Sequence, residues 1–110
     1  PLARLDAESQ KLLGLRQWTV PAEQRFEQGF DDAGGQPRIV WADYAVQGDR
    51  RAILHVEAED ELRGSGAAGK FMQSLADHAR AERISLVPRC SYAVAWFKRH
   101  PDQTDVLAKA

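Results

Sequence analysis

The segment from Leu62 to Lys70 is rich in glycine and stands between an acidic turn and an amphipathic stretch. Gly64, Gly66 and Gly69 lack a Cβ atom, so the backbone there can adopt left-handed conformations and approach a ligand closely. N–H groups at the start of a following helix would favour an anion. The segment therefore predicts a loop that binds a phosphate-bearing ligand at a helix N-terminus.

The residues after this loop have the most regular pattern in the chain. Apolar side chains recur every three or four positions from Ala68 to Ala79, which predicts an amphipathic helix. β-branched and aromatic runs bounded by turn residues predict strands on both sides of it. In chain order we expect a capped helix over 6–13, a strand or packed extension at 18–21, strands over 25–30, 39–46 and 52–57, the helix after the loop, a strand over 84–87 and a short helix over 92–97. This order predicts an α+β fold, in which helices pack on a sheet built from an antiparallel meander.

Size and charge limit what the loop can belong to. With 110 residues and a net charge of -1, the chain suits one domain without the broad basic surface of a nucleic-acid-binding protein. Membrane spanning is not expected, since no apolar run approaches the roughly 20 residues needed. The first residues, 1–4, lack the apolar core of a signal peptide, so a cytoplasmic location is expected. The single cysteine, Cys90, excludes an internal disulfide and a cysteine-based zinc site, and no metal is expected.

Two nucleotide-binding patterns overlap on the loop, and both fail on their context. Gly64-x-x-x-x-Gly69-Lys70 matches a P-loop until Phe71, which replaces the Ser or Thr that binds magnesium. The spacing of Gly64, Gly66 and Gly69 also matches a dinucleotide fingerprint. That motif follows directly on a parallel strand and expects an acidic residue about 20 positions later, and neither condition holds here. The loop is therefore not expected to bind ATP or NAD.

A third pattern, Arg63-x-x-Gly66-x-Ala68, resembles the acyl-CoA loop of the GNAT superfamily of N-acetyltransferases. Three flanking elements are similar to the compact YjdJ-type GNAT-like family: His55-x-Glu57, Pro88-x-Cys90-x-Tyr92 and His100-Pro101. Val56 and Ser91 depart from the usual residues of that family. The resemblance covers roughly residues 26–107, so we expect a GNAT-like domain over 25–110 and an N-terminal extension of uncertain structure over 1–24.

The resemblance implies a site for acetyl-CoA, bound as a cosubstrate between two splayed strands of a mixed sheet. The backbone of Val56 and Ala58 would bind the pantetheine arm, and the pyrophosphate would lie against the N–H groups of the loop. The loop residues implied in this site are Arg63, Gly64, Ser65, Gly66, Ala67, Ala68, Gly69 and Lys70. Arg63 or Lys70 would reach a phosphate, although a solvated cation at a helix start is the alternative.

The same resemblance implies catalytic roles for four side chains. Glu57 matches the carboxylate that deprotonates the amine. Strand alternation puts His55 on the same face as Glu57, and Leu54 and Val56 on the other face. Cys90 is a candidate nucleophile, which needs a helix N-terminus, a cation or a base nearby. Tyr92 would protonate the departing CoA thiolate. The structural alternatives are a solvated Glu57, a hydrogen-bonded His55 in the sheet, and a Cys90 and Tyr92 that serve packing.

We therefore expect an acetyl-CoA-dependent N-acetyltransferase. Its acceptor would be an unidentified amine, either a small molecule or a protein, attacked directly or through an acetyl group on Cys90. The alternative is a non-catalytic CoA-binding or protein-interaction module on the same fold. Neither nucleic acid nor membrane is expected as a partner, and a homodimer stays open.

Overall fold

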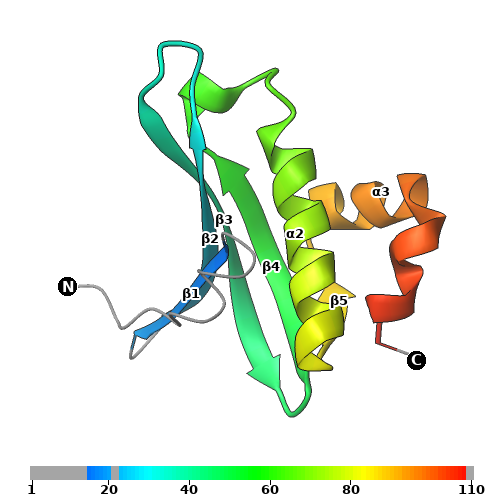
Figure 1. Ribbon diagram of the computed structural model, residues 1–110. Helices are drawn as coiled ribbons and strands as arrows, with labels where there is room; N and C mark the ends of the chain where they lie inside the picture. The colour runs from blue at the N-terminus through cyan, green and yellow to red at the C-terminus, as the bar shows by residue number, and fades with distance from the viewer. Residues whose placement is uncertain (1–14, 21–22, 109–110) are drawn as a thin grey trace.

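The structure is a computed structural model that describes residues 15–20 and 23–108 (Figure 1). A five-stranded sheet has the strand order β1-β2-β3-β4-β5. The strands are β1 (Leu15–Val20), β2 (Glu23–Asp31), β3 (Pro37–Gln47), β4 (Arg50–Ala58) and β5 (Ser85–Pro88). The helical elements are the 3-10 turn η1 (Asp60–Leu62), α2 (Ala67–Glu82), α3 (Ser91–Arg99) and the 3-10 turn η2 (Pro101–Val106). Strands β1 to β4 form an antiparallel meander and β5 runs parallel to β4, which confirms the predicted α+β fold.

The N-terminal expectations meet the structure only in part. The predicted helix over 6–13 lies outside the described residues. The undecided segment at 18–21 falls largely on β1, which pairs with β2 along its whole length. The region expected to be an extension therefore contributes an edge strand to the sheet.

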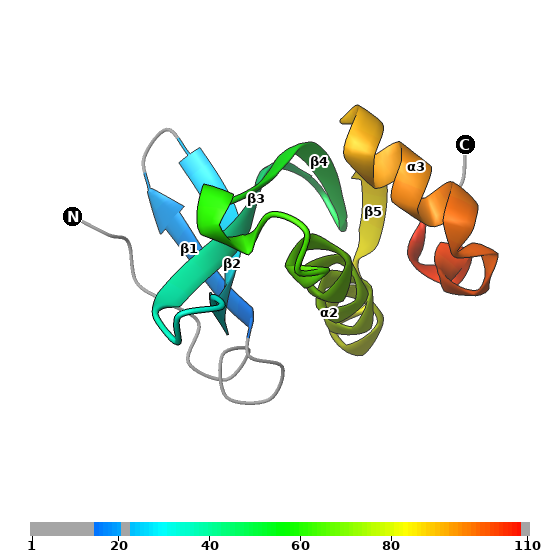
Figure 2. The ribbon, with the colours of Figure 1, turned by 90° about the horizontal axis from the view of Figure 1, so that it is seen from above.

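Helix α2 covers one face of the sheet, and α3 lies beside β5 at the far end (Figure 2). Phe71, Met72 and Leu75 of α2 are fully buried, as the helical periodicity predicts. On the sheet side, Phe26 of β2 stacks on Tyr44 of β3 with ring centroids 4.3 Å apart. These side chains form one continuous core, which fixes α2 and the loop before it relative to β4.

Strand β4 contains a bulge at Leu54. Asp43 pairs with His55 and Tyr44 pairs with Ile53, so Leu54 is an extra residue between the two pairs. Ile53 is fully buried and Val56 packs against the core, whereas Leu54 is 50% exposed. The expectation that Leu54 and Val56 share a face is therefore wrong, because the extra residue shifts the alternation.

The C-terminal turn η2 is held on α2 by an ion pair. Arg80 donates from Nε and Nη2 to the two carboxylate oxygens of Asp105, each at 2.8 Å. Gln73 Nε2 also donates to Gln103 Oε1 at 3.0 Å.

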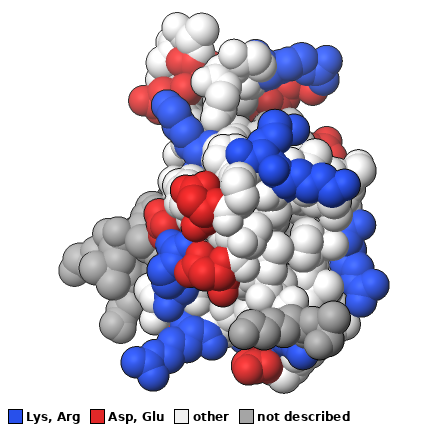
Figure 3. Space-filling view, turned by 90° about the vertical axis from the view of Figure 1, so that its right-hand side faces the viewer, with Lys and Arg blue, Asp and Glu red and all other residues white. Residues whose placement is uncertain are grey.

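On the side that carries α3 and η2, Lys and Arg side chains are interspersed with Asp and Glu among the coloured atoms (Figure 3). Among the described residues, no helix combines the length and the apolar character that crossing a membrane requires.

Candidate functional site

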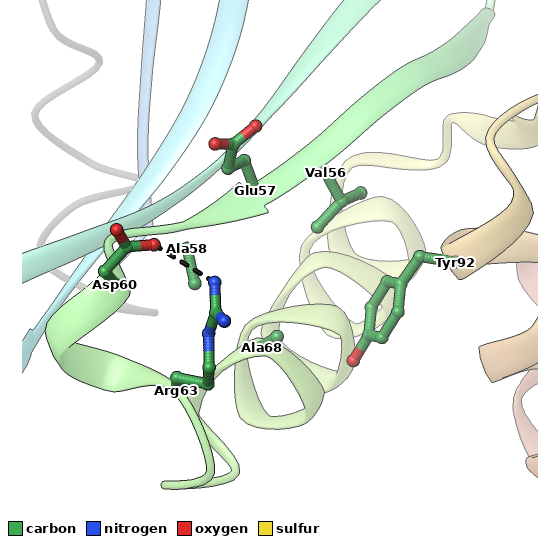
Figure 4. Close-up of a pocket in the computed structure, with 7 residues that line it drawn as sticks. All are labelled: Val56, Glu57, Ala58, Asp60, Arg63, Ala68 and Tyr92. Carbon is green, nitrogen blue, oxygen red and sulfur yellow. Dashed lines mark hydrogen bonds and ion pairs between the residues drawn. The ribbon is translucent and has the colours of Figure 1, made fainter.

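Strands β4 and β5 separate at the bulge. Their pairing ends at Ile53 and Pro88, and the Arg89 N–H still donates to Ile53 O at 2.9 Å. The rest of β4, from Leu54 to Ala58, continues beside β3 without a partner from β5. A cavity of about 320 Å³ lies at this separation. Its lining residues are Val56, Glu57, Ala58, Asp60, Arg63, Ala68 and Tyr92 (Figure 4).

The loop before α2 is shaped by its glycines and by Ser65. Gly64 and Gly66 have φ values of 79° and 82°, a left-handed conformation that favours glycine. Ser65 Oγ donates to Leu62 O at 2.6 Å and accepts from the Ala67 N–H at 3.2 Å. The Lys70 N–H donates to Gly66 O at 3.1 Å.

The first N–H groups of a helix have no carbonyl partner within the helix. Within the described residues, those of Ala68 and Gly69 make no hydrogen bond. They lie at the positive end of the 16-residue helix α2, and Ala68 lines the cavity. The loop therefore leaves two N–H groups beside the cavity that have no partner among the described residues.

Arg63 projects over the cavity from the loop (Figure 4). Its Nη2 atom is 3.2 Å from Asp60 Oδ1, and both side chains are more than four-fifths exposed. An exposed pair of this kind is weak and can exchange Asp60 for another anion. Lys70 is exposed and is not among the lining residues.

Asp60 is a lining residue that sequence reasoning missed, because it stands in an acidic run that is typical of a solvated turn. Its neighbour Glu59 has a structural role, since Glu59 Oε2 accepts from the Ile39 N–H at 2.7 Å. This bond ties the segment after β4 to β3 and sets where the loop begins. The signal available in the sequence was that the carboxylates of this acidic run can accept hydrogen bonds.

His55 and Glu57 lie together on one face of β4. His55 Nε2 is 2.6 Å from Glu57 Oε1, and each side chain is about half exposed. Glu57 projects from the opposite side of β4 to Val56, away from α2 (Figure 4). The prediction that these two side chains share one face is confirmed, and the contact between them places a carboxylate and an imidazole beside the cavity.

Tyr92 approaches the cavity from the first turn of α3, across from Val56 (Figure 4). Its partial burial raises the pKa of the Tyr92 hydroxyl above the ordinary value of 10, and the nearby Cys90 adds to this. Arg99 on the same helix acts in the opposite direction. The hydroxyl is therefore protonated at neutral pH and able to donate a proton.

Cys90 is the N-cap residue of α3. Its Sγ atom accepts from the Ala93 N–H at 3.4 Å, and the side chain packs partly against the core. Cys90 is two residues from Tyr92 but is not among the residues that line the cavity. The structure thus gives Cys90 the helix N-terminus that a nucleophilic thiol requires, together with a capping role.

The structure brings most of the predicted site to one place. The cavity gathers Val56, Ala58, Arg63 and Ala68 with Glu57 and Tyr92, and His55 joins through Glu57. The backbone of residues 64–67 forms the loop beside the cavity, whereas Cys90 is not among the lining residues. The described residues contain no group of three or more His, Cys, Asp or Glu side chains able to hold a metal ion.

Residues 25–106, from β2 through η2, match the family model described as GCN5-related N-acetyl-transferase. No match was found among curated proteins. The matched range includes every residue of the cavity and of the loop.

Proposed function

Because the chain belongs to the GCN5-related N-acetyltransferase family, we propose that it transfers an acetyl group from acetyl-CoA to an amine. One observation carries the proposal: the cavity between β4 and α3 ends at the N–H groups that open α2. Acetyl-CoA carries a thioester at one end of a long arm and a pyrophosphate at the other end. This shape matches a slot that ends in an anion site. The elements His55-x-Glu57, Pro88-x-Cys90-x-Tyr92 and His100-Pro101 support membership of the compact YjdJ-type group.

In this proposal the loop holds the phosphates and β4 holds the arm. The amides of Ala68 and Gly69 donate to the pyrophosphate, and Arg63 leaves Asp60 to pair with it. The free edge of β4 at Val56 and Ala58 offers backbone donors and acceptors to the amide groups of pantetheine, as a missing strand would. The thioester then lies near the bulge, where β4 and β5 separate.

Glu57 acts as the general base in the direct route. Its carboxylate takes a proton from the ammonium of the acceptor, and His55 stays in hydrogen-bond contact with that carboxylate. The amine nitrogen forms a bond to the thioester carbonyl carbon and loses its second proton to solvent, and the carbon–sulfur bond breaks. Tyr92 gives its proton to the departing thiolate and regains one from solvent. The products are the N-acetylated amine and CoA.

Cys90 offers a covalent route at the same place. Its thiolate would attack the thioester carbonyl carbon and release CoA, and the amine would then take the acetyl group from Cys90 and regenerate the thiol. Cys90 accepts from the Ala93 N–H at the start of α3, but it is not among the residues that line the cavity. The direct route therefore has the stronger support.

Incubation with acetyl-CoA and a panel of amines tests this function by the release of free CoA thiol. We expect release that depends on both substrates. Thiol release without an amine, together with an acetyl mass on Cys90 after rapid quenching, would favour the covalent route. Binding of CoA without turnover of any amine would contradict the enzyme proposal and favour a CoA-binding module.

A further inference from the structure

The chain leaves the sheet at Glu59, where a side chain takes over a hydrogen bond of its own backbone. Val40 pairs with Ala58, so Glu59 is the next partner of Ile39 in the β3–β4 register. The Glu59 N–H donates to Ile39 O at 3.1 Å, as regular antiparallel pairing requires. The Ile39 N–H, however, donates to Glu59 Oε2 at 2.7 Å. The Glu59 carbonyl is thereby released from the sheet, and it accepts from the Leu62 N–H at 2.9 Å in η1.

Further hydrogen bonds connect η1 to the start of α2. Leu62 is buried in the core, and its carbonyl accepts from both the N–H and the Oγ of Ser65, at 3.0 and 2.6 Å. Ser65 Oγ in turn accepts from the Ala67 N–H at 3.2 Å. One series of hydrogen bonds therefore runs from Ile39 of β3 to the first residue of α2. The two N–H groups that we assign to the pyrophosphate come next along the helix.

Arg38 holds the Glu59 carboxylate from the β2–β3 hairpin, which lies beside η1 (Figure 1). Arg38 Nη1 is 3.8 Å from Glu59 Oε1, and Arg38 Nε donates to Asp32 Oδ2 at 2.9 Å. Asp32 is fixed in the hairpin, because its Oδ1 atom accepts from two backbone N–H groups of the turn. Glu61 Oε2 is 3.6 Å from Arg38 Nη1, but its half-exposed side chain contributes little.

We propose that Glu59, supported by Arg38, is a positioning residue for CoA, because it sets where β4 ends and where the phosphate-binding loop begins. This inference rests on the proposed function. Glu59 is not among the residues that line the cavity, whereas its neighbours Ala58 and Asp60 are. It therefore acts through the path of the chain, and the β2–β3 hairpin serves as the support on which the loop is held.

The two contacts of Glu59 make different demands on its side chain. The bond from the Ile39 N–H needs an oxygen acceptor, which glutamine also has and alanine lacks. The contact with Arg38 needs a negative charge, but it is long and partly exposed, so it is the weaker of the two. Glu59→Gln should therefore keep most of the positioning that Glu59→Ala loses.

Equilibrium titration with CoA tests the inference without an acceptor amine. We expect Glu59→Ala to raise the dissociation constant about 3- to 10-fold, Glu59→Gln to change it less than about 2-fold, and Arg38→Gln to raise it about 2-fold. The Glu59 side chain is 34% exposed, so its truncation leaves the core intact. Hydrogen exchange followed by NMR, without ligand, should show faster exchange of the Ile39 amide in Glu59→Ala and not in Glu59→Gln.

Asp105→Asn is the matched control, since it breaks the ion pair with Arg80, which lies in the last turn of α2 at the far end from the loop. It should lower the urea midpoint and leave CoA binding unchanged. If Glu59→Ala binds CoA as the unaltered protein does, the inference is wrong. Equal weakening by Glu59→Gln and Glu59→Ala, or by Asp105→Asn and Glu59→Ala, would also overturn it. Failure of the unaltered protein to bind CoA contradicts the proposed function instead.

Discussion

His55 Nε2 lies 2.6 Å from Glu57 Oε1, two residues along the same strand and on the same face. The pair stands immediately after the bulge at Leu54, which is also where β4 parts from β5. A bulge re-aims the side chains that follow it and ends regular pairing. Two features of one strand, a free backbone edge and a carboxylate with an imidazole partner, therefore arise at a single irregularity.

Glu57→Gln tests the role of this carboxylate. Because an amide cannot accept the proton of the ammonium, kcat should fall about 10²- to 10⁴-fold while acetyl-CoA binding is unchanged. The control is Glu61→Gln, which changes an exposed carboxylate of the neighbouring acidic run and should keep full activity. Steady-state kinetics at saturating acetyl-CoA decide the matter, and equal activity of the two variants would remove Glu57 from the mechanism.

Two glycines of the loop should respond in opposite ways to alanine. Gly66→Ala forces a Cβ onto a residue at φ 82° and should cost about 1 kcal/mol of unfolding free energy, with weaker CoA binding. Gly69 is inside α2, where an added Cβ meets Trp96 Nε1 at an ordinary 3.9 Å. Gly69→Ala should therefore keep or raise stability, by up to about 1 kcal/mol. Urea unfolding measures both, and equal losses would show that backbone conformation at Gly66 is not the cause.

The sequence was sufficient for the elements that periodicity and turn residues define. Helix α2 and the strands on either side of the loop follow from the spacing of apolar residues, because their buried faces leave a repeating pattern. The shared face of His55 and Glu57 follows from simple alternation. Their proximity to the loop follows from chain order, since only a few residues separate the two.

Other features depend on contacts that no local pattern records. The register between β3 and β4 shifts at Leu54, which leaves this residue as a bulge. Alternation alone therefore put Leu54 on the wrong face of the strand. The lining role of Asp60 depends on how η1 places its carboxylate beside Arg63, with Oδ1 3.2 Å from Nη2. The sequence predicts a helix start close to Cys90, but the capping contact from the Ala93 N–H to Cys90 Sγ depends on the exact residue at which α3 begins.

Acid should weaken the attachment of η2 to α2. The hydrogen bonds from Arg80 hold the pKa of Asp105 below its ordinary value, so the folded state binds this proton less readily than the unfolded chain. The stabilisation is present above the unfolded pKa near 4 and is lost as pH falls through the lowered folded pKa.

Urea midpoints at about pH 7 and about pH 2 measure the effect. Asp105→Asn should lower the midpoint at neutral pH and make it less sensitive to acid. Asp102→Asn is the control, because the Asp102 carboxylate accepts from Gln103 Nε2 rather than from an arginine. An Asp105→Asn protein with unchanged acid sensitivity would contradict this account.

Tyr92 should ionise above pH 10. The chain has two tyrosines, so Tyr44→Phe leaves Tyr92 as the sole source of tyrosinate absorbance. Burial raises the Tyr92 pKa, and Arg99→Gln should raise it further by removing a nearby positive charge. Because the folded state keeps this proton to higher pH than the unfolded chain, stability should decline as pH rises above about 10. A Tyr92 that titrates at or below 10 in the folded protein would contradict its partial burial.

The central claim is that the slot between β4 and α3, closed by the loop before α2, binds acetyl-CoA. A thermal unfolding series with acetyl-CoA, CoA, ATP and NAD tests it most directly. At a hundredfold excess over the dissociation constant, a specific ligand adds about 2.7 kcal/mol to stability. We predict that acetyl-CoA and CoA raise the midpoint, that ATP and NAD do not, and that Gly66→Ala weakens the response. A shift with ATP or NAD but not with CoA, or no shift with any of the four, would contradict the assignment.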